Sequence, residues 1–358
     1  MSHQEKTFWF RLTLKVEFPG ESILLVTVRL VFRADASPII GTGHVMRLSA
    51  IAEEAIQRGL DCVFVGDISG VSWLSDRILA LGFSRIFSPT HFRAQSESDV
   101  LILDSYHLST EDFSIQGSSF RYLVLIADEL TPSYVADLVI HPGLDGAWYT
   151  GNRDNFHFGS EFIPIRKTIE FSGSRFNKEV REILVFGGGT DAFNVAGELA
   201  VVLTKFEKIQ KVTFFSANNG SEIEGLDSRF VVKPFGSDLD SEVNRADLVL
   251  STASTSSFEI IARAKPLGVI CVINNQRSNF DAIGKMGIAA RIGTRSESNE
   301  WQFDLETLER LVYDYEYRSL LQKKSKNLID GLGAFRILNL ITNLDLQSKT
   351  TIPPGVER

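Results

Sequence analysis

The amino-acid sequence predicts an α/β protein with two doubly wound, Rossmann-like domains that face each other across a cleft. A chain of 358 residues with 44% hydrophobic content is too long for one ordinary core. Short apolar runs alternate with helical patterns in both halves, and their continuous hydrophobicity is typical of parallel strands buried on both faces. Between the halves, at about 166–178, the polar stretch RKTIEFSGSRFNK indicates a linker.

The first predicted domain covers residues 28–165. Its strands are the runs VRLVF, CVFVG, DVLILD, YLVLIAD and DLVI, and amphipathic helices are expected at Val45–Arg58 and Val71–Leu81. Residues 1–27 precede the first strand, and we interpret them as an N-terminal extension without an assigned function.

The second predicted domain covers residues 179–332. Its strands are the runs EILVFGGG, KVTFFSA, RFVVKPF, DLVLS, PLGVICVI and IAARIG, and a long helix is expected from about Leu305. Open α/β sheets bind ligands at the carboxyl ends of their strands. The expected site therefore lies in the cleft between the two domains.

Composition excludes several classes of partner. A net charge of -8 offers no overall attraction to nucleic acid or to anionic lipid. The longest apolar run near the N-terminus, Ile23–Val28, is too short to span a bilayer, so no stable membrane insertion is expected. Cys62 and Cys271 each sit in an apolar run and are interpreted as buried free thiols, which favours a cytoplasmic location. The oligomeric state is not predicted.

The stretch RADASPIIGTGHVMR, at 33–47, carries the strongest signal for chemistry. Its glycines let a ligand approach the backbone, and His44 falls in the first turn of the following helix, where free N–H groups suit a diphosphate. A neutral base beside an anion site suits attack by water on a carbon that bears a phosphate leaving group. We expect His44 to be catalytic and the other polar and glycine residues to contact the substrate: Arg33, Asp35, Gly41, Gly43 and Arg47.

The same stretch allows a simpler interpretation. His44 could be a capping or packing histidine, with the glycines acting only as turn formers. The stretch also lacks the third glycine and the later acidic residue of the dinucleotide fingerprint, so binding of NAD is disfavoured.

Four further clusters follow predicted strands. Asp104 and Tyr106 follow the strand in DVLILDSY and so lie at its carboxyl end. They could orient the imidazole or hydrogen-bond a sugar hydroxyl. Alternatively, Asp104 could cap the next helix. A glycine-rich turn in FGGGTDAFN can cradle phosphates but lacks the lysine of a P-loop. Its candidate contacts are Gly188, Gly189, Thr190 and Asp191.

The segment LSTASTSSFEIIARAKP brings hydroxyls to the start of a helix. We expect Ser254, Thr255 and Ser256 to hold phosphate oxygens and Glu259 to accept both hydroxyls of a ribose. The alternative is a capping box made by Ser256 and Glu259. Farther on, Asn275 and Gln276 follow a strand and could contact a sugar or phosphate, or form a plain loop.

Taken in order, RADASPIIGTGHVMR, DSY, FGGGTDAFN, the Ser/Thr-rich segment and NNQ resemble the motifs of a known enzyme family. These are the nucleotide-sugar hydrolases of pseudaminic acid biosynthesis, which cleave UDP-2,4-diacetamido-2,4,6-trideoxy-β-L-altropyranose to the free sugar and UDP and are related to the GT-B glycosyltransferases. The resemblance runs from about Leu30 to Leu344. It implies a GT-B-like fold, a small-molecule nucleotide-sugar substrate, no metal or other cofactor, and C–O cleavage by water at the anomeric carbon.

The resemblance also implies roles for single residues. His44 matches the proposed general base, Tyr106 matches a tyrosine that faces the reacting sugar, and Glu259 matches the ribose-binding acid. Asn275 and Gln276 match an Asn-Gln pair near the ligand. Residues 333–358 would form a helix that closes back on the first domain, followed by a tail.

Two departures from the family pattern lie on the sugar side. The family has an Asp-Asp pair where this chain reads IADEL, and an Asn-rich stretch where it reads IHPG. Asp128 and His141 could reshape the sugar pocket there. The departures therefore bear on the identity of the sugar more than on that of the nucleotide. Two alternative functions also stay open, a glycosyltransferase that uses the same donor site and a sugar-nucleotide-binding module without catalysis.

Overall fold

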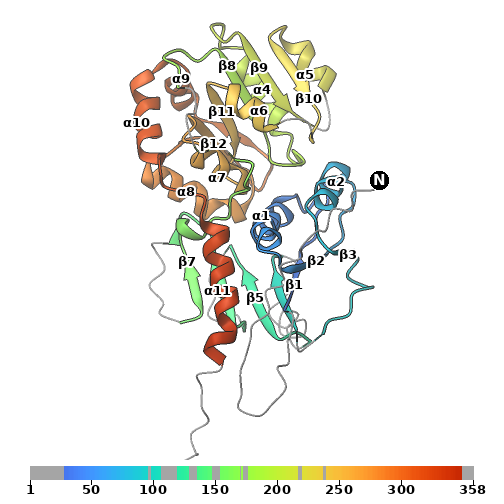
Figure 1. The fold of residues 1–358 in the computed structure, drawn as a ribbon. Helices are drawn as coiled ribbons and strands as arrows, with labels where there is room; N and C mark the ends of the chain where they lie inside the picture. Colours follow the sequence, from blue (N-terminus) through green and yellow to red (C-terminus); the bar gives the residue numbers. More distant parts are fainter. Residues whose placement is uncertain are drawn as a thin grey trace, which may run out of the picture.

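The computed structural model describes residues 28–95, 98–105, 119–128, 135–146, 154–169, 171, 176–216, 220–236 and 239–348. Within these ranges the chain forms two seven-stranded sheets, each with its own helices (Figure 1). The predicted architecture of two parallel α/β domains is confirmed. The exact division of the chain at residues 166 and 178 stays a prediction.

The first sheet is parallel throughout, with the strand order β3-β2-β1-β4-β5-β6-β7. Its helices in the described residues include α1 (Gly43–Gln57) and α2 (Ser72–Ala80). The strands are β1 (Arg29–Arg33), β2 (Asp61–Val65), β3 (Arg85–Phe87), β4 (Asp99–Leu103), β5 (Tyr122–Ile126), β6 (Leu138–His141) and β7 (Phe156–Phe158). A short 3₁₀ helix, η2 (Ser160–Phe162), follows β7.

The second sheet repeats this topology in the order β10-β9-β8-β11-β12-β13-β14, and its last strand runs antiparallel. Its strands are β8 (Glu182–Phe186), β9 (Lys211–Phe215), β10 (Phe230–Lys233), β11 (Leu248–Thr252), β12 (Leu267–Cys271), β13 (Ala290–Arg295) and β14 (Trp301–Phe303). The helices are α4 (Val195–Leu203), α5 (Gly220–Leu226), α6 (Leu239–Arg245), α7 (Thr255–Ala262), η3 (Asn274–Gln276), α8 (Arg277–Met286), α9 (Leu305–Tyr313) and α10 (Tyr315–Ser325).

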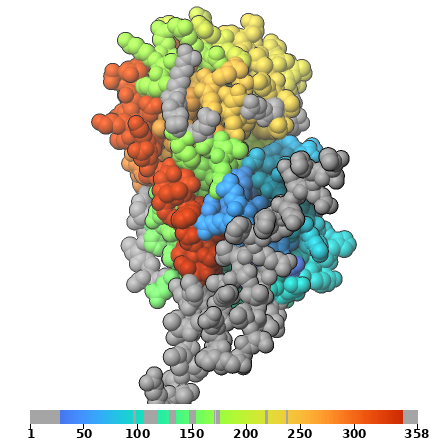
Figure 2. All heavy atoms as spheres, viewed as in Figure 1, coloured from blue at the N-terminus to red at the C-terminus, as the bar shows by residue number. Residues whose placement is uncertain are grey.

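The chain crosses back at its end. Helix α11 (Gly333–Ser348) lies beside α1, as the red and blue segments of Figures 1 and 2 show. Its apolar residues Ile337, Leu338 and Ile341 are buried in the core of the first domain. This packing ties the end of the second domain to the first.

Several elements differ from the sequence prediction. The expected long helix from Leu305 is two helices, because Asp314 leaves the helical conformation and caps α10 by accepting from the Tyr317 N–H at 3.0 Å. The three-residue strands β3, β7 and β14 were not predicted, since runs so short carry little periodicity. Cys62 and Cys271 are buried free thiols, as predicted. No helix in the described residues is long and apolar enough to cross a membrane.

The strand order fixes where ligands can bind. In each sheet the second and third strands are added on one side of the first strand, and the fourth strand is added on its other side. The switch points therefore lie between β1 and β4 and between β8 and β11. Loops diverge there at the carboxyl ends of the strands and leave a crevice. The residues that follow these four strands are the ones that the sequence singled out.

Candidate active site

A cavity of about 650 Å³ lies between the two domains. The first domain contributes the 39–44 turn, the start of α1 and one side of α2 to its wall. The second domain contributes the glycine turn after β8, the residues after β11 and the start of α8. The cavity therefore lies where both switch points face each other.

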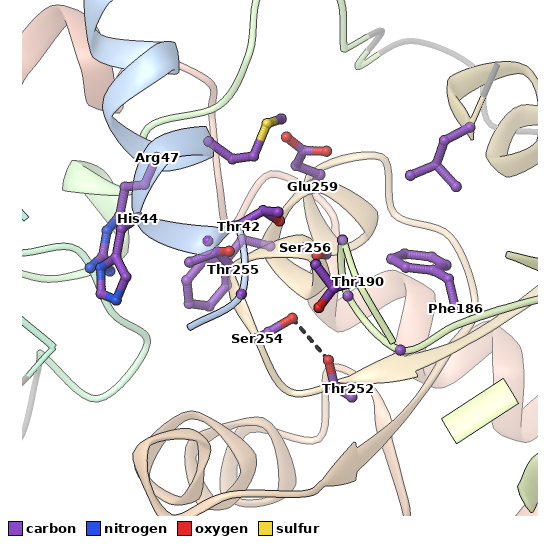
Figure 3. Close-up of a pocket in the computed structure, with 18 of the residues that line it drawn as sticks. Thr42, His44, Arg47, Phe186, Thr190, Thr252, Ser254, Thr255, Ser256 and Glu259 are labelled. Atoms are coloured by element: carbon purple, nitrogen blue, oxygen red, sulfur yellow. Dashed lines mark hydrogen bonds between the residues drawn. The ribbon is translucent and has the colours of Figure 1, made fainter. Parts of the chain in front are cut away.

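His44 lines the cavity from the first turn of α1 and is only 5% exposed. Its Nδ1 lies 2.5 Å from Oδ1 of Asp104, which follows β4 on the other side of the switch point. Arg47, one turn farther along α1, donates to both oxygens of the same carboxylate at 2.7 and 2.8 Å. A second carboxylate, that of Asp128, accepts from Nη1 of Arg47. The imidazole thus rests on a buried network of charges, and Figure 3 shows it beside Arg47.

The charges around Asp104 keep it ionised. Burial alone would raise the pKa of this carboxyl, but the charge of Arg47 and the hydrogen bonds to Arg47 and His44 lower it to about 2. Burial lowers the pKa of Arg47, but the carboxylates of Asp104 and Asp128 raise it by more. Asp104 therefore offers a charged acceptor to His44 at any pH at which an enzyme is assayed.

The low pKa of Asp104 predicts a pH-dependent contribution to stability. Because the folded-state pKa lies below the ordinary value of about 3.8, the contribution is fully present above that value and is lost as the pH falls through about 2. We expect Asp104→Asn to lower the free energy of unfolding by on the order of 2 kcal/mol from pH 8 to pH 5, and by less below pH 4. Urea denaturation of both proteins between pH 8 and pH 3 measures this. A difference that grows as the pH falls below 5 would contradict the assignment.

The predicted phosphate-binding turns of the two domains touch each other. A Cβ atom at Gly189 would lie 2.0 Å from Oγ1 of Thr42, so only glycine allows Thr42 to approach the turn after β8. Likewise, a Cβ at Gly43 would lie 3.2 Å from Oγ1 of Thr255. The N-termini of α1 and α7 thus meet across the cleft. Thr42 precedes α1 without capping it, and Figure 3 shows it near Thr255 and Ser256.

Glu259 lies one turn inside α7 and lines the cavity. The capping box that was the alternative for this residue is not formed, because both of its oxygens accept from Arg166, at 2.6 Å each. Arg166 also donates to Asp240 at 3.1 Å. A carboxylate has about four lone-pair sites, so a bidentate arginine leaves room for two hydroxyl donors. Arg166 fixes the plane of the Glu259 carboxylate within the cavity.

The polar residues near the start of α7 and α8 differ in how they are used. Ser254 accepts from the Thr252 hydroxyl at 2.9 Å, the bond drawn as a dashed line in Figure 3. Gln276 lines the cavity, but its Oε1 accepts from the backbone N–H of Val272 at 3.1 Å and so shapes the turn after β12. Asn275 has a buried side-chain oxygen with no hydrogen-bond partner among the described residues. A ligand donor is the natural partner for this oxygen.

Thirteen of the predicted residues line the cavity: Gly41, Gly43, His44, Arg47, Gly188, Gly189, Thr190, Ser254, Thr255, Ser256, Glu259, Asn275 and Gln276. Asp104 stands behind the wall, against His44. Tyr106 lies outside the described residues.

The structure does not bring three predicted substrate contacts to the cavity wall. Arg33 and Asp35 pair with each other at 2.6 and 2.8 Å, and Asp35 also accepts from the N–H of Asp67, so this pair braces the end of β1. The Asp191 carboxylate accepts from the N–H groups of Val195 and Ala196 and thereby caps α4. Burial raises the pKa of Asp191 to about 6 although these N–H groups lower it. Spacing in the sequence could not show in which direction these side chains point.

Other wall residues were missed by the sequence analysis. Arg166 was placed at the start of the linker, and Trp73 and Arg77 in a helix without an assigned role. For Arg166 the available signal was its place at the end of the apolar run IPIR. For Trp73 and Arg77 it was their spacing of four residues on one predicted helix. Neither pattern is distinctive without the fold.

No family model matches this chain. Among curated proteins it is 21% identical over 277 residues to the UDP-2,4-diacetamido-2,4,6-trideoxy-β-L-altropyranose hydrolase of Campylobacter jejuni, with 73% of this chain and 97% of the relative covered. It is 24% identical over 259 residues to the UDP-N-acetylglucosamine–N-acetylmuramyl-(pentapeptide) pyrophosphoryl-undecaprenol N-acetylglucosamine transferase of Campylobacter jejuni subsp. doylei. That match covers 63% of this chain and 73% of the relative.

Solved structures resemble the whole two-domain fold. The crystal structure of Acinetobacter baumannii MurG has 15% identity and a TM-score of 0.57, covering 88% of this chain and 99% of MurG. The S. aureus MnaA-UDP co-structure has 12% identity and the same TM-score, covering 92% of this chain and 100% of MnaA. The protein therefore has a GT-B-like fold, as the sequence predicted.

Proposed function

We propose that the protein hydrolyses a UDP-sugar to the free sugar and UDP. The sugar would be 2,4-diacetamido-2,4,6-trideoxy-β-L-altropyranose or a related amino sugar, in nonulosonic acid or surface polysaccharide biosynthesis. The observation that carries the proposal is the buried His44–Asp104 pair, whose imidazole lines the cavity beside the two glycine-containing turns that face each other. The similarity to the Campylobacter jejuni hydrolase supports the choice of substrate.

In this proposal His44 is the general base. Its Nδ1–H donates to Asp104, so proton transfer uses Nε2. The water oxygen forms a bond to the anomeric carbon while its proton passes to Nε2, and the bond from that carbon to the phosphate oxygen breaks. The electron pair leaves with UDP. A positioned base contributes roughly 10²–10⁴ in rate, which is less than an ordinary enzyme needs.

The remaining rate enhancement comes from positioning and from stabilising the leaving diphosphate. The starts of α1 and α7 offer N–H groups and the positive ends of two helix dipoles. Thr42, Thr190 and Thr255 also line the cavity, and Figure 3 shows them near one another. Because donors of both domains meet there, both domains would hold the diphosphate.

Incubation with a panel of UDP-, CMP- and dTDP-sugars, without any acceptor, tests the proposal. We expect free UDP and free sugar in equal amounts from a UDP-amino sugar. No release from any member of the panel would refute hydrolysis.

The second candidate is a glycosyltransferase that uses the same donor site. The apolar rim of the cavity favours it, since Ile39 is 91% exposed and lines the cavity with Ile40, where an acceptor with an apolar part could lie. UDP release that requires an added sugar or lipid acceptor would establish transfer. A binding module without catalysis would instead bind UDP tightly and show no turnover with or without acceptors.

A further inference from the structure

Helix α2 presents two different faces. Leu74 and Ile78 are fully buried in the core of the first domain. On another face, residues at positions i, i+3, i+4 and i+7 line the cavity between the domains: Trp73, Asp76, Arg77 and Ala80. Figure 1 shows α2 at the edge of the first domain that points toward β10 and α6 of the second. Packing of the core explains only the first of these faces.

Trp73 contacts the second domain directly. A Cβ at Gly236 would lie 2.6 Å from the Cβ of Trp73, and Gly236 has a φ of +88°, so glycine is required at this contact for two reasons. Gly236 belongs to the turn after β10, whose neighbours Phe235 and Leu239 also line the cavity. This end of the cavity is therefore apolar and aromatic, as a nucleobase requires, and both domains build it.

Arg77 differs from the other arginines of the cavity wall. Two of these, Arg47 and Arg166, each donate two hydrogen bonds to one carboxylate. A third, Arg263, donates to the carboxylate of Asp240 and to the side-chain amide of Asn244. Arg77 makes one hydrogen bond with the described residues, from Nη2 to Glu53 at 3.0 Å. A guanidinium has five N–H donors, and Nε of Arg77 is buried without a partner in the described chain. Nε of Arg263 is likewise without a partner there, but Arg263 makes three other hydrogen bonds. Its side chain is 25% exposed at the wall.

The surroundings of Arg77 indicate which part of a ligand it meets. Burial and the charge of Arg166 lower the pKa of Arg77, while Glu53, Glu259 and Asp240 act in the opposite direction. Arg77 thus lies in the electrostatic range of Glu259, the proposed ribose acceptor, and one turn along α2 from Trp73. An acceptor oxygen at this place would satisfy donors that the described residues leave unused.

We propose that α2 of the first domain forms a wall of the nucleoside subsite, where Trp73 covers the pyrimidine base and Arg77 donates to an oxygen of the nucleoside. The inference rests on the proposed function, because it assumes that a pyrimidine nucleoside diphosphate occupies the cavity. It adds that the nucleoside, and not only the sugar, is recognised by both domains.

Titration of UDP and of uridine into wild-type protein and Arg77→Met tests this assignment. Methionine keeps the aliphatic part of the side chain and removes the donors. We expect the affinity for both ligands to fall by the same factor, about tenfold or more, because both carry the nucleoside. Leu79→Ala is the matched control, since Leu79 lies on α2, is 68% exposed and is absent from the cavity wall. It should bind both ligands as wild type does.

Three outcomes would overturn the inference. If Arg77→Met binds both ligands as wild type does, Arg77 does not contact the ligand. If it binds UDP more weakly but uridine equally well, Arg77 contacts the diphosphate and not the nucleoside. An equal loss in Glu53→Gln would show that Arg77 acts only by joining α2 to α1. A wild-type protein that binds neither ligand would instead contradict the proposed function.

Tryptophan fluorescence gives an independent readout. The chain has four tryptophans, and of Trp73 and Trp301, which are described, only Trp73 lines the cavity. We expect UDP to quench the emission of the wild type and much less that of Trp73→Phe. Equal quenching in both proteins would contradict the placement of the base against Trp73.

Discussion

Replacing His44 by alanine is expected to lower kcat for UDP release by roughly 10²–10⁴, the contribution of a positioned general base. The affinity for UDP should change little, because the imidazole is not among the groups that would hold the nucleotide: the backbone N–H groups at the starts of α1 and α7, the glycine turn after β8 and Glu259. Steady-state kinetics with the best UDP-sugar of the panel, together with a titration of UDP, separates the two effects.

His91→Ala is the matched control for this variant. His91 is exposed and is not part of the cavity wall, so its removal should leave kcat unchanged. A His44→Ala protein that releases UDP at the wild-type rate would remove His44 from the mechanism. Loss of UDP binding in the same variant would assign the side chain to the nucleotide and not to the reaction.

Replacing Arg47 by methionine is expected to cause a large loss of stability. The guanidinium is almost fully buried and joins Asp104 and Asp128, so its removal takes away the cation between these two carboxylates. Removal of one partner from a buried ion pair typically costs about 3–5 kcal/mol. For a domain of this size the midpoint of thermal unfolding should fall by about 10 °C.

Thermal unfolding of Arg47→Met beside Arg181→Ala measures the difference. Arg181 pairs with Glu179 on the surface, where both side chains are more than half exposed, and such pairs contribute about 0–1 kcal/mol. Equal unfolding temperatures for the two variants would show that the network under His44 is not needed for folding. The charge of Arg47 lowers the pKa of Asp104, so this pKa should rise in the methionine variant. As the pH is lowered, the activity of the variant should therefore fall at a higher pH than that of the wild type.

The fold could be predicted because its signals are local and repeated. Continuous apolar runs such as DVLIL and DLVLS mark strands that are buried on both faces, and the same alternation occurs in both halves. The site could be placed because a doubly wound sheet brings the residues after its first and fourth strands together. In this way His44 and Asp104, sixty positions apart, reach hydrogen-bonding distance.

The direction of a side chain was harder to predict than its position. Arg33 and Asp35 alternate along the end of β1, and no local pattern shows that they pair with each other. Asp191 follows three glycines as a phosphate-contacting residue could, yet a left-handed φ of 49° turns its carboxylate toward α4. Contacts between segments far apart in the sequence, such as Thr42 on Gly189 across the cleft and Arg166 on Glu259, depend on how the whole fold packs and leave no trace in either segment alone.

The most direct test of the central claim is hydrolysis in ¹⁸O-labelled water with analysis of the released UDP by mass spectrometry. If water that is activated by His44 attacks the anomeric carbon, the label enters the sugar and the UDP contains none. Label in the terminal phosphate of UDP would mean that water attacks phosphorus, and it would contradict the placement of His44 at the anomeric centre.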